Sequence, residues 1–347
     1  MKVYLVLSIL FLGCLPNLEN DASQNLAINI KQITTHTTLK PFLIKESNKI
    51  EFKHLQRYKG QGLEFTSIAR MESVQLNGLN LAATSTFLRD SIAFIGFEYT
   101  DITYSGMVLI VNISNIQLPK VVGAISFEHA DIRHLYFVRK SNINYLFVGG
   151  ASLMYEGRPA FVSQIVLNDS LLMSESVSPT VYDLPGYGVT GMVQKGSTGN
   201  SLYVASGYSE GGVSVISISD QRLEGTIISE DQVRGVGYSS DGIVTLTDKT
   251  LSKYDKDTFE KLLEVDVLSD SLVSSKSSLN IYGTSVVFGV GENGTQVHNI
   301  SDLSLLDSIP QVDFTSNSSL YTQLQKKYTV TNGSYATDEY LFTASGG

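Results

Sequence analysis

One kind of short apolar segment returns six times along the 347-residue chain, and this repetition limits the folds that the chain can adopt. Each copy is nearly continuous in apolar or small residues, as expected of a strand buried between neighbouring sheets. Counted between their first hydrophobic residues, the copies lie about 41 to 57 residues apart. The six segments are residues 91–96, 145–150, 202–207, 242–247, 286–291 and 340–347.

Further strands follow these segments. A second strand recurs in one frame at residues 107–114, 212–219 and 294–301, with weaker copies at 160–167 and 250–257. A third, outer strand follows at residues 119–123, 223–227, 261–265 and 305–309. Repeats of about 40 to 50 residues that hold about four strands each are typical of a β-propeller. The sequence therefore predicts an all-β chain with the β-propeller fold.

Three of these segments resemble the LVIVD-repeat family of bacterial surface propellers. The likeness is carried by Tyr203–Gly207, Leu109–Ser114 and Pro119–Gly123, and it covers roughly residues 60–347. The family pattern has Asp after its central V-I-V step, where this chain has Asn112 and, in a later copy, Ser217. The resemblance implies a propeller exposed at a bacterial surface, and it implies little about function.

The end of the chain bears on the number of blades. Residues 340–347 stop where a second strand should begin, and residues 62–69 fit the frame of that missing strand. Residues 72–76 would then supply an outer strand. We expect six blades of four strands, closed by pairing of the N-terminal strands at about 62–78 with the C-terminal blade. Such closure protects sheet edges that otherwise invite aggregation.

The amino terminus has the composition of an export signal. Lys2 is followed by an apolar run at residues 3–12, which is too short to span a bilayer. Leu10–Cys14 resembles the bacterial lipobox, with Phe11 as a departure, and Cys14 is the only cysteine in the chain. We expect a signal peptide at residues 1–13, lipid attachment at Cys14, a tether at 14–55 and the propeller at 56–347. An ordinary signal peptide cut near Ala22 is the alternative.

Charge and composition exclude some classes of function. The chain has 25 basic and 34 acidic residues, a net charge of −9, and no cluster of Lys and Arg. Binding to nucleic acid requires such a cluster, so we expect no nucleic-acid partner. The chain also lacks Trp, which argues against the quinone-dependent propeller dehydrogenases. We found no nucleotide-binding loop, calcium loop or nucleophile elbow in a suitable context, and we expect no cofactor.

The best candidates for chemistry lie in one short stretch, residues 128–134. Asp131 and His134, together with Glu128 or His129, offer carboxylate and imidazole ligands for a metal ion. This stretch precedes a predicted innermost strand, at the face of the central channel. The alternative is structural: Asp131 caps a turn, and His134 and Arg133 pair with acidic neighbours.

Tyrosines mark the longest departures from the repeat, which are residues 98–105, 152–158 and 174–187. Each ring has an apolar body and a polar tip, which suits contacts with a protein or a glycan. The alternative is that Tyr simply serves as a strand residue in this chain. The tyrosines concerned are Tyr99, Tyr104, Tyr155, Tyr182, Tyr187 and Tyr208.

The sequence favours a monomeric, exported, lipid-anchored propeller that acts as a non-enzymatic binding module at the bacterial outer membrane or cell surface. A secreted or periplasmic location is the alternative. The competing function is a metal-dependent hydrolase or lyase with its site at the central channel, formed by Glu128, Asp131 and His134. Fold alone does not decide between them, because propellers host many activities.

Overall fold

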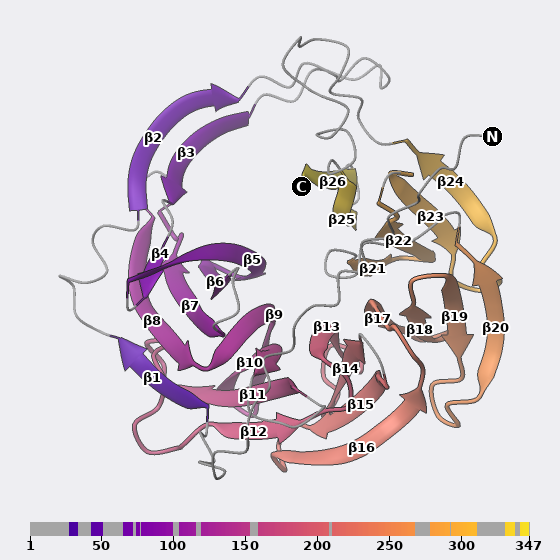
Figure 1. The fold of residues 1–347 in the computed structure, drawn as a ribbon, viewed down its shortest axis with the longest axis horizontal. Helices are drawn as coiled ribbons and strands as arrows, with labels where there is room; N and C mark the ends of the chain where they lie inside the picture. The colour runs from indigo at the N-terminus through magenta and orange to yellow at the C-terminus, as the bar shows by residue number, and fades with distance from the viewer. Residues whose placement is uncertain are drawn as a thin grey trace, which may run out of the picture.

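The computed structural model describes residues 28–33, 43–50, 65–71, 74–76, 78–99, 104–115, 119–152, 159–207, 210–267, 278–291, 293–310, 330–336 and 341–346. Its strands form one six-stranded, four four-stranded and two two-stranded antiparallel sheets. The larger sheets follow one another around a common axis, and the first strand of each four-stranded sheet is innermost (Figure 1). Within the described residues, no helix has the length and apolar character needed to span a bilayer.

Four sheets have the simple four-stranded meander of a propeller blade, in which neighbours in sequence are neighbours in the sheet. Blade 2 contains β9 (Ala130–Lys140), β10 (Ile143–Ser152), β11 (Ala160–Leu167) and β12 (Thr180–Asp183). Blade 3 contains β13 (Gly188–Gln194), β14 (Ser201–Gly207), β15 (Gly212–Ser217) and β16 (Arg222–Ser229). Blade 4 contains β17 (Gly235–Ser239), β18 (Gly242–Leu246), β19 (Thr250–Tyr254) and β20 (Lys261–Asp266). Blade 5 contains β21 (Leu279–Tyr282), β22 (Ser285–Gly289), β23 (Thr295–Asn299) and β24 (Leu305–Ile309).

Blade 1 is larger than the others. Its meander consists of β5 (Leu79–Arg89), β6 (Ile92–Tyr99), β7 (Ser105–Asn112) and β8 (Lys120–Glu128). β4 (Val74–Leu76) is added at the inner edge, and β1 (Asn29–Ile33) is added at the outer edge. Both additions are antiparallel to the strands that they join.

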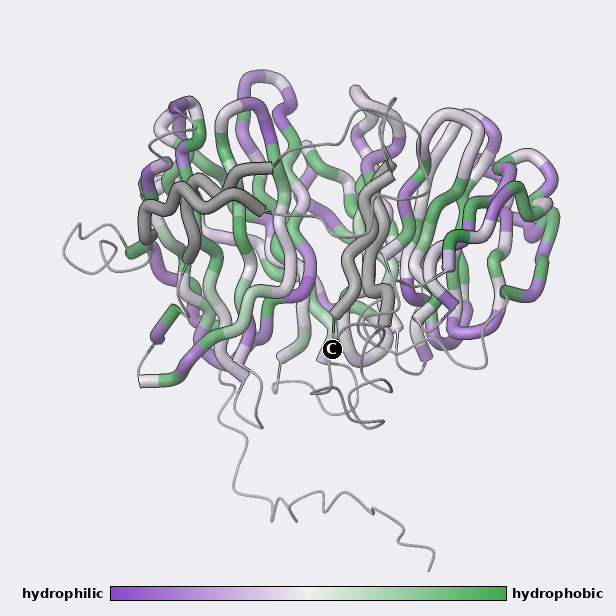
Figure 2. Tube along the Cα trace, turned by 90° about the horizontal axis from the view of Figure 1, so that it is seen from above, coloured by the Kyte–Doolittle hydropathy of each residue, from purple (hydrophilic) through white to green (hydrophobic). Residues whose placement is uncertain are grey.

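The periodicity that predicted the blades is confirmed by this arrangement. The recurring apolar segment is the second strand of each blade, and its side chains are buried on both faces in β6, β10, β14, β18 and β22. A strand between two neighbouring blades must bury both faces, which explains its unbroken apolar sequence. Apolar residues follow the strands in Figure 2, and hydrophilic residues gather at many of the turns.

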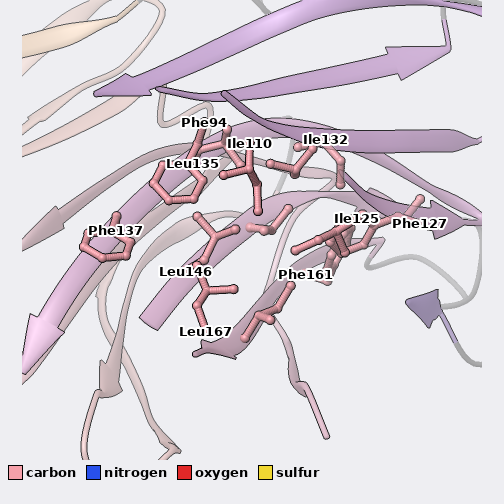
Figure 3. Packing of buried hydrophobic residues seen from close by; sticks show 14 residues of the cluster. Phe94, Ile110, Ile125, Phe127, Ile132, Leu135, Phe137, Leu146, Phe161 and Leu167 are labelled. Atoms are coloured by element: carbon pink, nitrogen blue, oxygen red, sulfur yellow. The ribbon is translucent and has the colours of Figure 1, made fainter. Parts of the chain in front are cut away.

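The core lies between blades. In Figure 3, Phe94 and Ile110 of blade 1 face Leu135 and Phe137 of blade 2, and the Phe94 and Phe137 rings stack with centroids 5.4 Å apart. Three further clusters fill the spaces between blades 2 and 3, 3 and 4, and 4 and 5. Burying these faces supplies the main driving force for folding, at roughly 25 cal/mol per Å² of apolar surface.

The same kind of side-chain-stabilised turn recurs in several blades. At the end of the third strand, the side-chain oxygen of Asn112, Asn168, Asp255 or Asn299 accepts backbone N–H groups two to four residues ahead. Such Asx turns start the hairpin to the fourth strand. Asn and Asp carry the same acceptor oxygen, so either residue can start this turn.

Three parts of the sequence prediction need correction. Residues 29–33 and 43–50, within the predicted tether, form the strands β1 and β2 (Leu43–Ile50). Residues 74–76 pair with β5 and form β4 of blade 1. They do not form the expected outer strand of the last blade, because Val74 is fully buried among apolar residues of blade 1. Tyr182, expected at the surface, is buried between blades 2 and 3.

The structure also contains two separate two-stranded sheets. β2 pairs with β3 (Phe65–Met71), and β25 (Val330–Ala336) pairs with β26 (Leu341–Gly346). β25 lies beside β21 and β22 of blade 5. Within the described residues, no ladder of hydrogen bonds joins the two small sheets.

Candidate functional site

The predicted site residues lie along one rim of the molecule, which we call the loop rim. In each blade this rim holds the start of the first strand and the end of the second. The registers show it: Leu81 pairs with Tyr99, Ala130 with Ser152, and Gly188 with Gly207. Tyr99, Tyr104, Glu128, Asp131 and Tyr187 therefore belong to the same rim. Cys14, Tyr155 and Tyr208 lie outside the described residues.

Asp131 ties blade 2 to blade 1. Its side chain is 6% exposed, and its Oδ1 accepts the backbone N–H of Ser105 at 3.1 Å. The backbone N–H of Tyr99 donates to the same carboxylate, so Asp131 holds both stems of the β6–β7 connection. Burial raises the pKa of Asp131 to about 7, and the nearby Glu98 carboxylate acts in the same direction, while Arg133 and the two N–H donors oppose it.

Arg133 occupies a β-bulge next to this carboxylate. Its neighbours Ile132 and His134 pair with Gly150 and Gly149, so Arg133 is the extra residue of β9. A bulge turns a side chain away from the regular alternation of a strand. The guanidinium Nε lies 3.6 Å from Glu98 Oε2 of blade 1.

Arg133 also reaches blade 3. A Cβ placed on Gly188 would lie 2.7 Å from Arg133 Nη1, so the guanidinium packs directly against the backbone at Gly188. The side chain thus spans three blades, from Glu98 to the start of β13. The ion pair is about a quarter exposed on each side, with side-chain exposures of 28% and 27%.

Two tyrosines border this group. The pKa of Tyr104 is raised, chiefly by burial and then by the negative charge of Asp131, with Arg133 opposing. Tyr187, just before β13, is 48% exposed and close enough to interact electrostatically with Tyr104. Tyr99 instead packs against the far face of blade 1, so it serves the fold more than the surface.

The three predicted metal ligands do not converge. Glu128 turns to β1, where it accepts hydrogen bonds from Asn29 at 2.7 Å and Lys31 at 3.0 Å, and the Lys31 bond lowers its pKa. His134 is half-buried, and burial lowers its pKa to about 4. Across the part of the chain that the structure describes, no group of three or more His, Cys, Asp and Glu side chains is placed to hold a metal ion.

The group that does assemble comprises Glu98, Tyr104, Asp131, Arg133 and Tyr187. We call it the rim cluster. It offers an ion pair, a carboxyl group that is partly protonated near neutral pH, and an exposed phenol. The sequence identified Asp131, the tyrosines and the pairing of Arg133 with an acidic residue. It did not identify Glu98 as that residue, because the bulge that aims Arg133 leaves no mark in the residue pattern.

Comparisons with known proteins give the fold. No protein-family model matches the chain, and no curated protein matches it. Among solved structures, the chain is similar to the Dos1 propeller, with 10% identity, a TM-score of 0.53, and coverage of 76% of this chain and 66% of that one. It is also similar to a chain of the Mitotic Checkpoint Complex, with 16% identity, a TM-score of 0.50 and 71% of each chain covered.

A weaker similarity links the chain to the WD40 domain of Pan2 from Neurospora crassa, with 14% identity, a TM-score of 0.46 and coverage of 66% of this chain and 65% of that one. The chain thus spans just under two thirds of the Pan2 and Dos1 structures. Sequence identities this low support a similarity of fold and nothing further. Together with the sheets described above, the similarity to the Dos1 propeller shows that this chain has the β-propeller fold.

Proposed function

We propose that this propeller is an exported, lipid-anchored, non-enzymatic binding module that contacts its partner through the loop rim. The observation that carries the proposal is the rim cluster, in which an exposed Tyr187 stands beside the Glu98–Arg133 ion pair on a frame built from three blades. Tyr and Arg are the residues that contribute most often to binding hot spots.

The rigidity of the frame supports a binding role. Glu98 and Arg133 hold one another, Asp131 holds the stems of the β6–β7 connection, and Gly188 fits against the guanidinium. A surface ordered before binding loses less conformational entropy when a partner arrives. The partner class that we propose is a protein or glycan surface that offers hydrogen-bonding groups to the ion pair and a flat face to Tyr187.

Site-specific photocrosslinking tests this proposal. A benzophenone amino acid would replace Tyr187 in the full chain, expressed in its native host. The matched control places the same probe at Leu88, which is 63% exposed and lies at the β5–β6 turn on the opposite rim. We expect one discrete adduct from position 187 and none from position 88. Equal labelling at both positions, or no adduct at 187, would contradict a binding role for the loop rim.

The lipid anchor is a separate proposal, supported by the Leu10–Cys14 motif and the lack of another cysteine. Membership of the LVIVD-repeat family is likewise proposed from the three matching segments. Metabolic labelling with a fatty-acid analogue tests the anchor. We expect labelling and membrane association of the full chain, and loss of both on Cys14→Ser. A wild-type chain that is unlabelled would contradict the anchor without bearing on the loop rim.

We further propose that β2–β3 and β25–β26 belong to one closing blade, which makes six. The support is the frame shared by residues 62–69 and 212–219, together with the position of β25 beside blade 5. Deletion of residues 60–71, which removes β3 and leaves β4 of blade 1 in place, should then leave the last blade incomplete and give an aggregating product. A soluble monomer with native-like cooperative unfolding would contradict this closure.

A further inference from the structure

The outer edge of blade 1 is covered by a strand from far upstream. β1 pairs with β8 over five residues, from Asn29 opposite Glu128 to Ile33 opposite Ala124. β8 suits this addition because its bulge, at Val122, leaves the rest of the strand regular. In β16, β20 and β24, bulges leave shorter regular runs. An irregular edge resists strand addition, so β8 is the favoured acceptor.

Side chains of β1 fix its position. Gln32 Nε2 donates to the Ala124 carbonyl at 2.8 Å, and Gln32 Oε1 accepts the N–H of Met173 from blade 2 at 2.7 Å. Ile30 packs into the core between blades 1 and 2, and Ile33 packs on the far face of blade 1. β1 therefore contacts two of the three blades that form the rim cluster.

The start of β1 binds Glu128, which lies just before Asp131 in the chain. Asn29 and Lys31 bind the carboxylate of Glu128, which pairs in the ladder with Ser105. Ser105 donates the backbone N–H that Asp131 accepts. Between Glu128 and Asp131 the chain makes a tight turn with His129 in the left-handed region, at φ 67°. This tight turn limits how far the carboxylates of Glu128 and Asp131 can move relative to each other.

We propose that β1 is a strap that positions the β8–β9 turn and the Ser105–Asp131 contact, so that the N-terminal segment and the rim cluster are mechanically coupled. The Lys31–Glu128 ion pair contributes little, because Lys31 is 55% and Glu128 34% exposed. The five-residue ladder and the hydrogen bonds of Gln32 contribute most of the stability of β1 on β8. Release of β1 frees the end of β8, loosens the turn and admits water to Asp131. The inference requires neither the lipid anchor nor an identified ligand.

The experiment uses the full chain with the double substitution Lys31→Ala and Gln32→Ala. The control is Gln75→Ala, which removes an exposed glutamine from β4, the strand added at the other edge of the same sheet, where it donates to Asn80 at 2.9 Å. Amide hydrogen exchange is read at Ser105 and Ala130, and the carboxyl titration of Asp131 is followed by NMR.

We expect exchange at Ser105 and Ala130 to accelerate at least about tenfold in the double variant, as for an opening whose equilibrium constant rises tenfold. The titration midpoint of Asp131 should fall, because added water favours its charged form. The control should match the wild type at both sites. Faster exchange confined to residues 29–33, with Ser105 and Ala130 still protected, would overturn the proposal. If the double variant does not fold, Gln32→Glu, which keeps the acceptor and loses the donor, gives the same comparison.

Discussion

The carboxylate of Asp131 in blade 2 accepts the backbone N–H of Ser105 in blade 1, across 3.1 Å. The bond joins two blades at the rim where the candidate site lies, and it does so with a side chain that is only 6% exposed. A buried carboxylate keeps its charge only with enough donors and counter-charges. Here the balance leaves the pKa of Asp131 at about 7, so the group changes charge near neutral pH.

Substitution of Asp131 by Asn should therefore stabilise the protein at high pH. The pKa of Asp131 is raised from 3.8 to about 7, so the folded state binds more protons than the unfolded state between these values. Its contribution to stability is present at low pH and is lost as pH rises to 7. The amide that replaces the carboxylate keeps an acceptor oxygen without the charge. At pH 8, Asp131→Asn should gain on the order of 2 kcal/mol in urea unfolding, with little gain at pH 4. A difference that stays constant from pH 4 to 8 would contradict this account.

His134 should have the opposite pH dependence. Burial lowers its pKa from 6.5 to about 4, so the unfolded state binds more protons between these values. Stability from the neutral imidazole is therefore lost as pH falls from 6.5 to 4. In His134→Gln, the loss in the free energy of unfolding between pH 6.5 and 4 should be smaller than in the wild type, by on the order of 1 to 2 kcal/mol. Thermal melts of both proteins from pH 4 to 7 measure this difference, and parallel dependences of the melting temperature on pH would argue against a neutral His134 imidazole in the folded state. The raised pKa of Asp131 changes stability in the opposite direction over part of this pH range. Only the difference between variant and wild type is therefore informative.

Gly150→Ala should be strongly destabilising. A Cβ at Gly150 would lie 1.8 Å from the backbone oxygen of Asp131, at the β9 bulge. Neither backbone can retreat, because both belong to one ladder, so we expect a loss of roughly 3 kcal/mol or more in the free energy of unfolding. The control is Gly283→Ala, which has open space around it but a φ of 57°. That change should cost only about 1 kcal/mol. Equal losses at the two positions would show that the bulge is not tightly packed.

Asn168→Ala removes the Asx turn of blade 2. Asn168 Oδ1 accepts the N–H groups of Ser170 at 2.9 Å and Leu172 at 3.1 Å. Their loss should lower the free energy of unfolding by about 1 kcal/mol, because the turn lies at the surface and water replaces part of the bonding. Asn168→Asp keeps the acceptor and should restore most of the stability in chemical denaturation. Failure of Asp to rescue would indicate that the amide Nδ2 matters instead.

The sequence predicts the blades well because their signal is local and repeated. A strand such as β14, which is buried on both faces, needs an unbroken apolar run, and the run is visible in Leu202–Gly207. β1 escaped prediction because an edge strand needs only a few apolar residues. Ile30 and Ile33 stand among Asn, Lys and Gln, and this composition is equally typical of a tether.

The site could be predicted only in part. Residues 128–134 are close in sequence, but the turn at His129 and the bulge at Arg133 send Glu128, Asp131 and His134 to different surroundings. The direction of each side chain depends on these two backbone irregularities, and neither changes the residue pattern. The partner of Asp131 lies 26 residues upstream, and its position follows only from the packing of two blades.

The place of β1 in the chain also bears on biosynthesis. Most strand pairs here join neighbours in sequence, whereas Lys31 and Glu128 are 97 residues apart. Contacts of such separation form late, after the local hairpins. Yet translation makes β1 first, so the covering strand is already present when the ribosome releases β8. An exposed edge invites association with other nascent chains. In this protein the strand that covers the edge of blade 1 is synthesised before the edge itself.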